Sequence, residues 1–137
     1  MPSPRTRILL DAGVFIGVAR GNAATAALVE AGAKRGPLFL AAHTYAEFYR
    51  GGARSAREAH LAGVWKPQPL DVTPEAGKLA GMLLAKTQGN NSMDALLVAV
   101  AALHGVTHIF TTDIRDITAL VGALERSPRG IAVTDAR

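Results

Sequence analysis

The sequence contains no cysteine, which excludes disulfide bonds and thiolate chemistry. It also lacks a long hydrophobic run, because the longest, Ala95 to Leu103, is far short of the roughly 18 residues that a membrane-spanning helix needs. The N-terminal residues meet a charged side chain, Asp11, too soon for a signal peptide. These absences predict a cytoplasmic protein without a membrane partner.

The common motifs of nucleotide binding and nucleophilic catalysis are missing as well. Gly13, Gly17 and Gly21 fit neither the dinucleotide-binding nor the P-loop spacing, and no serine lies in a nucleophile elbow. The histidines are scattered without metal-ligand spacing, which argues against a zinc site. We interpret His104 and His108 as a helix-end and a strand-start residue.

What the chain does have is the size and composition of one globular domain. It has 137 residues, of which 49% are hydrophobic. The formal net charge is +4 and the isoelectric point is about 10.0, and arginine outnumbers lysine. A basic surface attracts polyanions such as nucleic acids, although charge alone is a weak indication of that function.

Short apolar runs alternate with helix-like segments along the whole chain. We predict strands at 7–11, 38–41, 68–72, 108–111 and 131–133, the third near a sheet edge because of its prolines. We predict helices at 14–19, 22–31, 44–50, 55–62, 74–87, 92–104 and 117–124, with a turn at 12–13 and a loop at 112–116. Asn22, Thr73 and either Asn91 or Ser92 are expected to cap helix starts, and Gly32 and Gly105 to end helices. The helix at 92–104 should be buried, because it is apolar on nearly every side. This alternation predicts a single α/β domain over residues 1–137, with a parallel sheet of four to five short strands flanked by helices. Residues 1–6 are expected to form a loose end.

Acidic residues stand where such a fold gathers its ligands, beyond the carboxyl ends of the strands. Asp11 follows the first predicted strand and Asp113 the fourth, whereas Glu47 and Asp94 lie in the first turns of two helices. Asp116 is a further candidate. Structural roles remain open for all of them: Asp11, Asp113 or Asp116 can cap a helix, Asp94 can pair with a helix dipole, and Glu47 can form a capping box with Thr44.

Convergence of these acids would need compensating charge. Two unit charges about 4 Å apart repel by roughly 4 kcal/mol at an effective dielectric near 20. A set of oxygen ligands without cysteine or paired histidines indicates Mg²⁺ or Mn²⁺, as one ion or two. A strand-end Asp11 would also suit an aspartyl-phosphate enzyme, but no second acid follows two residues later. A basic protein with an acidic metal site fits a nuclease best.

Four segments in order carry a resemblance to a known family. They are Leu9–Ile16, Thr44–Gly51, Met93–Ala99 and Phe110–Asp116, and the resemblance that they carry extends in order over nearly the whole chain. With these segments the chain resembles PIN-domain proteins of the VapC type, the toxin ribonucleases of type II toxin–antitoxin systems. It departs from the family in two respects, because Asp116 closely follows Asp113 and Ile117 replaces a frequent phenylalanine.

The resemblance implies a Mg²⁺- or Mn²⁺-dependent endoribonuclease. Asp11, Glu47, Asp94 and Asp113 would form its acidic pocket, with Asp11 and Asp94 as direct metal ligands. Thr111 or Thr112 would be the small hydroxyl residue that supports the site. The family further implies a VapB-like antitoxin, whose tail blocks the pocket, and a homodimer.

Together, residues and resemblance predict metal-dependent hydrolysis of RNA. Asp11, Asp94 and Asp113 would hold the metal, with Asp116 as an additional possibility, while Glu47 and Asp113 complete the shell through water or orient the attacking water. Arg50, Arg54 and Arg115 are candidates to hold phosphates of the RNA. The alternative is a catalytically inert RNA-binding or scaffold domain on the same fold.

Overall fold

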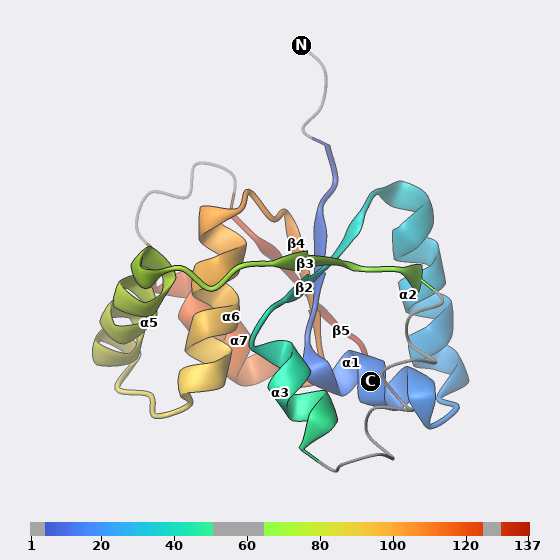
Figure 1. Ribbon diagram of the computed structural model, residues 1–137, viewed down its shortest axis with the longest axis horizontal. Helices are drawn as coiled ribbons and strands as arrows, with labels where there is room; N and C mark the ends of the chain where they lie inside the picture. Colours follow the sequence, from blue (N-terminus) through green and yellow to red (C-terminus); the bar gives the residue numbers. More distant parts are fainter. Residues whose placement is uncertain (1–4, 51–64, 125–129) are drawn as a thin grey trace.

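Five strands run side by side through the middle of the molecule and are connected by helices (Figure 1). The computed structural model describes residues 5–50, 65–124 and 130–137. The elements are β1 (Ile8–Leu10), α1 (Ala12–Ala19), α2 (Ala23–Arg35), β2 (Leu38–Ala41), α3 (Thr44–Tyr49), β3 (Gln68–Leu70), α5 (Pro74–Thr87), α6 (Ser92–Leu103), β4 (His108–Thr111), α7 (Ile114–Gly122) and β5 (Ala132–Asp135).

All strand pairs are parallel, in the order β3-β2-β1-β4-β5. The chain therefore moves outward from β1 in one direction through β2 and β3, and in the other direction through β4 and β5. In sheets of this kind, ligands bind at the carboxyl ends of the strands where the direction reverses. Here that place lies between β1 and β4, which pair from Ile8 with His108 to Leu10 with Phe110.

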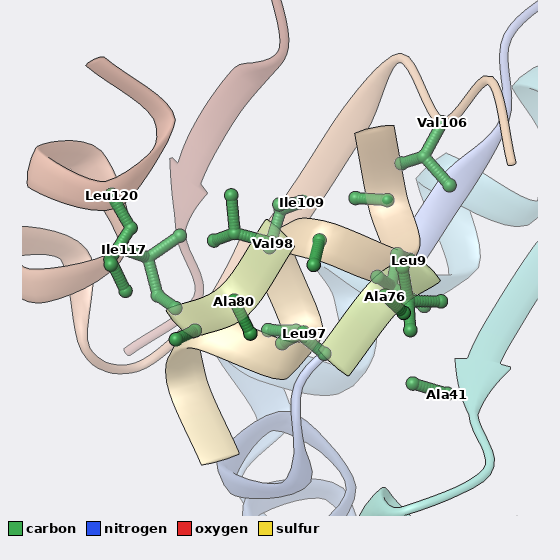
Figure 2. Close-up of a cluster of buried hydrophobic side chains, with 14 of the residues drawn as sticks. Leu9, Ala41, Ala76, Ala80, Leu97, Val98, Val106, Ile109, Ile117 and Leu120 are labelled. Atoms are coloured by element: carbon green, nitrogen blue, oxygen red, sulfur yellow. The ribbon is translucent and has the colours of Figure 1, made fainter. Parts of the chain in front are cut away.

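Each face of the sheet is covered by its own layer of helices (Figure 1). One hydrophobic cluster joins α5, α6 and α7 to the sheet through residues such as Leu97, Val98 and Ile109, and Figure 2 shows this cluster. The other joins α1 and α2 to the opposite face through Val14, Val29 and Phe110 among others. The predicted α/β fold with a helix-flanked parallel sheet is confirmed.

Helix α6 is buried along most of its length because it lies between the sheet and α5. Its buried residues include the unbroken run from Leu97 to Ala101. The helix begins after Asn91, whose side-chain oxygen accepts a hydrogen bond from the backbone N–H of Asp94 at 3.1 Å. It ends at Leu103, just before Gly105, which has a positive φ of 68°. A buried helix with these two ends is what its sequence predicts.

Several predicted boundaries agree with the structure. Strands β2 and β4 have the predicted bounds, β3 lies at a sheet edge, and Thr73 caps α5 with Pro74 in its first turn. Asn22 caps α2 as predicted, and His104 and His108 lie at a helix end and a strand start. The predicted helix at 55–62 lies outside the described residues.

Other boundaries were predicted wrongly. Helix α1 begins at Ala12, where a turn was predicted, and α7 begins at Ile114 within the predicted loop. Helix α2 does not stop at Gly32 but continues to Arg35. Gly32 is buried, and a β-carbon added to it would lie 2.9 Å from the ring of Phe110. This glycine permits close packing of the helix on the sheet instead of ending the helix.

Among the described residues, no single helix is long and apolar enough to cross a membrane. Helices α1 and α2 meet the criteria of length and composition only as a pair, and the chain bends by 119° between them.

Candidate functional site

The central strands end in side chains that are hydrogen-bonded to each other. Asp11 follows β1, and its backbone N–H donates to the carbonyl of Phe110 in β4 at 3.0 Å. Thr111, the last residue of β4, is fully buried, and its hydroxyl donates to Oδ2 of Asp11 at 2.7 Å. The same hydroxyl oxygen accepts a hydrogen bond from the backbone N–H of Asp113 at 2.9 Å. Thr111 thus holds the chain after β1 against the chain after β4.

The first turn of α6 brings Asp94 to the same edge of the sheet. Its side chain is only 8% exposed, because the helix that carries it is inserted into the core. Its Oδ2 atom is buried and has no hydrogen-bond partner among the described residues. Leaving a buried carboxylate oxygen without a partner is costly, so this atom points to a ligand that the described residues do not supply.

Asp94, Asp113 and Asp116 form a compact group of carboxylates. One oxygen from each lies within 4.8 Å of the oxygens of the other two. Asp113 occupies the N-cap position of α7 but makes no side-chain capping hydrogen bond, and Asp116 lies in the first turn of that helix. The proposed capping role of Asp113 is therefore not seen, and both acids lie beside Asp94.

Asp94 also lines a cavity of about 270 Å³. Asp11, Glu47 and Asp94 line it together with His43 and the cap residue Asn91. The capping box predicted for Glu47 is absent, because α3 has His43 at its N-cap and Thr44 is its first helical residue. Without that box, the Glu47 carboxylate lines the cavity. Asp94 lines this cavity and is also one of the three clustered carboxylates. It therefore links Asp11 and Glu47 in the cavity to Asp113 and Asp116 in the cluster.

Burial dominates the electrostatics of Asp94. Desolvation, followed by the charge of Asp11, by hydrogen bonding to Asp113 and by the charges of Asp113 and Asp116, raises the pKa of Asp94 to about 7. Among the described residues, no lysine or arginine forms an ion pair with Asp11, Asp94 or Asp113. The carboxylate is therefore costly to ionise unless a cation other than those of the described residues binds there.

The surroundings of Asp11 shift its pKa in opposite directions. Burial raises its pKa, whereas the hydrogen bonds from Thr111 and from the backbone N–H of Ala12 lower it. The charges of Asp113 and Glu47 raise it further, and the net result is an elevated pKa. Asp11 caps α1 through Ala12, with a hydrogen bond of 2.7 Å, and it also lines the cavity. Asp11 can therefore cap α1 and take part in the site at the same time.

The donor chemistry of the site fits a divalent cation that prefers oxygen. Every group in the carboxylate cluster offers oxygen, and the partnerless Oδ2 of Asp94 is such a ligand atom. Mg²⁺ and Mn²⁺ bind oxygen ligands of this kind in proteins, whereas zinc favours nitrogen and sulfur. The residues present are therefore suited to hold Mg²⁺ or Mn²⁺.

His43 is a site residue that the sequence analysis missed. Its Nε2 atom lies 3.0 Å from the carbonyl oxygen of Met93, next to Asp94. Since a carbonyl only accepts, Nε2 carries the proton and Nδ1 is the acceptor nitrogen. Nδ1 is buried without a partner among the described residues, and burial lowers the pKa of the ring. The only signal in the sequence was that His43 immediately precedes the helix of Glu47.

The structure describes two of the three candidate arginines. Arg50 and Arg115 are exposed, at the end of α3 and in the first turn of α7, and Arg54 lies outside the described residues. Arg137 was not predicted, yet it lies close enough to Asp113 to sense its charge. It is paired with Asp135 at 3.0 Å, after the carboxyl end of β5.

Thr112 has a packing contact at the site. A β-carbon added to Gly13 in α1 would overlap the Thr112 hydroxyl. The absence of a side chain at Gly13 therefore allows the segment after β4 to approach the start of α1, which Asp11 caps. Thr111 contacts Asp11 directly, whereas Thr112 contacts α1, the helix that follows Asp11.

A family model described as PIN domain matches residues 8–122 of the chain. Solved structures with the same fold include VapBC2 from Rickettsia felis bound to a DNA fragment from their promoter, with a TM-score of 0.71 and 13% identity over 93% of this chain and 97% of that one. A toxin–antitoxin complex from Klebsiella pneumoniae has a TM-score of 0.70 and 17% identity, with 95% and 98% covered. FitAcB from Neisseria gonorrhoeae has a TM-score of 0.66 and 19% identity, with 94% and 97% covered. No curated protein matches the sequence.

Proposed function

Because the chain belongs to the PIN domain family, we propose that it is a metal-dependent endoribonuclease and the toxin of a VapBC-type toxin–antitoxin pair. The toxin assignment is supported by the solved structures that share its fold, several of which are toxin–antitoxin assemblies. Their sequence identity to this chain is below 20%, so the enzymatic proposal depends on the chemistry of the site.

One observation carries the enzymatic proposal: the buried Asp94 carboxylate has a partnerless oxygen and lies among other acids. A purely structural aspartate at a helix start would have its oxygens satisfied by the helix or by a cation of the chain. Within the described part of the chain, Oδ2 of Asp94 has neither, and Asn91 provides the cap instead. The cost of this arrangement is explained if a divalent cation binds there.

We assign Asp11, Asp94 and Asp113 as metal ligands, with Asp116 as a further ligand. A bound Mg²⁺ or Mn²⁺ would act as a Lewis acid on the phosphate and lower the pKa of a water molecule. The chain's own residues prepare this site. Thr111 and the N–H of Ala12 orient Asp11, and Asn91 fixes the first turn that carries Asp94.

The remaining acids act around the metal ligands. Glu47 lines the cavity, which supports a role in orienting the attacking water, and Asp113 is proposed to complete the shell directly or through water. Arg50, Arg54 and Arg115 are proposed to hold phosphates on the exposed rim, where the net charge of +4 favours RNA. The VapB-like antitoxin, the homodimer and the cytoplasmic location remain predictions.

The test is the substitution Asp94→Asn. We expect it to abolish Mg²⁺-dependent cleavage of RNA while the protein stays folded, because the amide keeps the shape of the side chain but loses the charge. Glu30→Gln removes an acid from the exposed surface of α2 and is the matched control, with full cleavage expected. Full activity of Asp94→Asn, or full activity of the unaltered protein in EDTA, would contradict the proposal.

A calorimetric titration with Mn²⁺ separates an enzyme from an inert RNA-binding or scaffold domain on this fold. Specific uptake that Asp94→Asn removes supports the metal site. RNA binding without any specific Mn²⁺ uptake would favour the inert domain.

A further inference from the structure

A second, smaller cavity lies beside the three clustered carboxylates and has Asp116 in its lining. Its volume is about 150 Å³, and it is formed by the end of α5, the loop before α6 and one side of α7. Leu84, Ala119 and Leu120 provide apolar surface, whereas Thr87 and Asn90 provide polar groups. Of its lining residues, only Asp116 and Asn91 have a role in the proposed metal site.

Asp116 and Asn91 connect this cavity to the proposed metal site. Asp116 lines the cavity, and one of its carboxylate oxygens lies within 4.8 Å of oxygens of Asp94 and Asp113. Asn91 lines both cavities and caps the helix that carries Asp94. A group in the second cavity would therefore adjoin whatever the carboxylates hold.

The lining combines an apolar face with groups that can form directional hydrogen bonds. Asn90 is exposed and carries both a donor and an acceptor. The Thr87 hydroxyl donates to the carbonyl of Leu83 at 2.9 Å, so its oxygen can still accept a bond. A nucleobase matches this pattern, because it has apolar faces and an edge with donors and acceptors, and asparagine pairs with such edges.

We propose that this second cavity binds an unstacked base of the RNA, from a nucleotide adjacent to the scissile phosphate at the carboxylate group. The inference rests on the proposed ribonuclease function and adds a base-binding subsite to it. A base can enter only when it leaves its stack. Asn90 then faces the base edge and contributes to base preference.

The matched variants for this proposal lie next to each other on α7. Ala119→Leu places a larger side chain in the cavity, and Ala119 is exposed, so the core is not disturbed. Thr118→Leu adds a similar side chain at a neighbouring exposed position that lines neither cavity. Any effect of exposed leucine alone is shared by both variants.

The first experiment needs no cleavage and uses the four ribonucleosides as probes. Titrated separately into ¹⁵N-labelled protein, at least one should shift the amide signals of Gly89, Asn90 and Ala119. The shifts should persist in Thr118→Leu and disappear in Ala119→Leu. Saturating nucleoside without shifts at these residues, or with the same shifts in both variants, would overturn the proposal.

The second experiment uses single-stranded RNA oligonucleotides in which one nucleotide at a time is abasic. At one position next to the cleavage site, loss of the base should lower kcat/KM roughly tenfold, the order expected for a base edge read by hydrogen bonds. In Ala119→Leu the loss at that position should vanish, because the base no longer enters. An unchanged abasic profile in Ala119→Leu would contradict the assignment.

The two proposals fail in different ways. If nucleosides bind in the second cavity but no RNA is cleaved with Mg²⁺ or Mn²⁺, the ribonuclease proposal is wrong and the base-binding site stands. If RNA is cleaved with the metal but neither experiment responds to Ala119→Leu, the ribonuclease proposal stands and the base-binding site is wrong.

Discussion

Thr111 shows how one hydroxyl can organise a site made of repelling acids. It is fully buried at the end of β4, where it donates to Asp11 and accepts from the backbone N–H of Asp113. A single side chain thereby orients one carboxylate and fixes the start of the segment that carries the next. The hydrogen bond to Asp11 also offsets part of the cost of burying that charge.

Thr111→Val should lower the free energy of unfolding by about 1–3 kcal/mol, because the isosteric side chain leaves the Asp113 N–H and an Asp11 oxygen without their partner. Thr111→Ser keeps the hydroxyl and is the control, with a clearly smaller loss. Urea unfolding measures both values, and RNA cleavage should fall further in the valine variant. Equal stability of the two variants would show that the hydroxyl does not hold the site together.

Helices α3 and α6 meet at the site through His43. The ring nitrogen at the N-cap of α3 lies 3.0 Å from the carbonyl of Met93 in the first turn of α6. This contact joins the helix of Glu47 to the helix of Asp94. Their carboxylates line one cavity partly because the two helix starts are held together.

His43→Leu should weaken cleavage and Mn²⁺ affinity together, because it removes the donor that joins the two helices. His43→Gln offers an amide N–H near the position of Nε2 and should retain more of both properties. Calorimetry with Mn²⁺ and the steady-state rate of RNA cleavage are the measurements. If the leucine and glutamine variants behave alike, the contact with Met93 does not position the acids.

The glycines of α2 and α5 have different roles in their helices. Gly32 of α2 faces Phe110 and Ile8 at distances too short for a β-carbon, whereas Gly77 of α5 has open space around it. Gly32→Ala should therefore lower the free energy of unfolding by about 1–3 kcal/mol through overpacking. Gly77→Ala should raise it by roughly 0.5–1 kcal/mol, because alanine favours the helix. Thermal and urea unfolding of the two alanine variants measure these changes. Stabilisation by Gly32→Ala would contradict the packing argument.

At the scale of the whole molecule, the buried acids couple folding to pH and to metal. The pKa of Asp94 is raised to about 7 from the ordinary value of 3.8 that it regains on unfolding. At a pH between these two pKa values, Asp94 is deprotonated in the unfolded chain but still protonated in the folded protein. Stability from this group is therefore present at low pH and lost as the pH rises toward 7. The raised pKa of Asp11 acts in the same direction.

In EDTA, the melting temperature of the protein should accordingly fall between pH 5 and pH 8, relative to the Asp94→Asn variant. Mn²⁺ should raise the melting temperature more at pH 8 than at pH 5, because protons compete with the metal for Asp94. Thermal unfolding at both pH values, with and without Mn²⁺, measures this. A metal effect of the same size at both pH values would argue against Asp94 as a ligand.

The sequence by itself determined the succession of strands and helices along the chain and the positions of the acids relative to them. Strand ends and helix caps depend on local chemistry, so the bounds of β2 and β4 and the caps Asn22 and Thr73 could be predicted directly, and the cap of α6 was narrowed to Asn91 or Ser92. Asp11 and Asp94 were recognisable because both lie in motifs of the family and because strand ends and helix starts meet at one edge of such a fold.

Only the tertiary structure decided which side chains come into contact and at which residues the helices end. Gly32 looks like a helix end in isolation, and its meaning changes once Phe110 packs against it. His43 had no signal of its own, because its partner Met93 is distant in sequence and contacts it only through folding. The second cavity likewise arises where α5 and α7 meet, and no local pattern encodes a space between two helices.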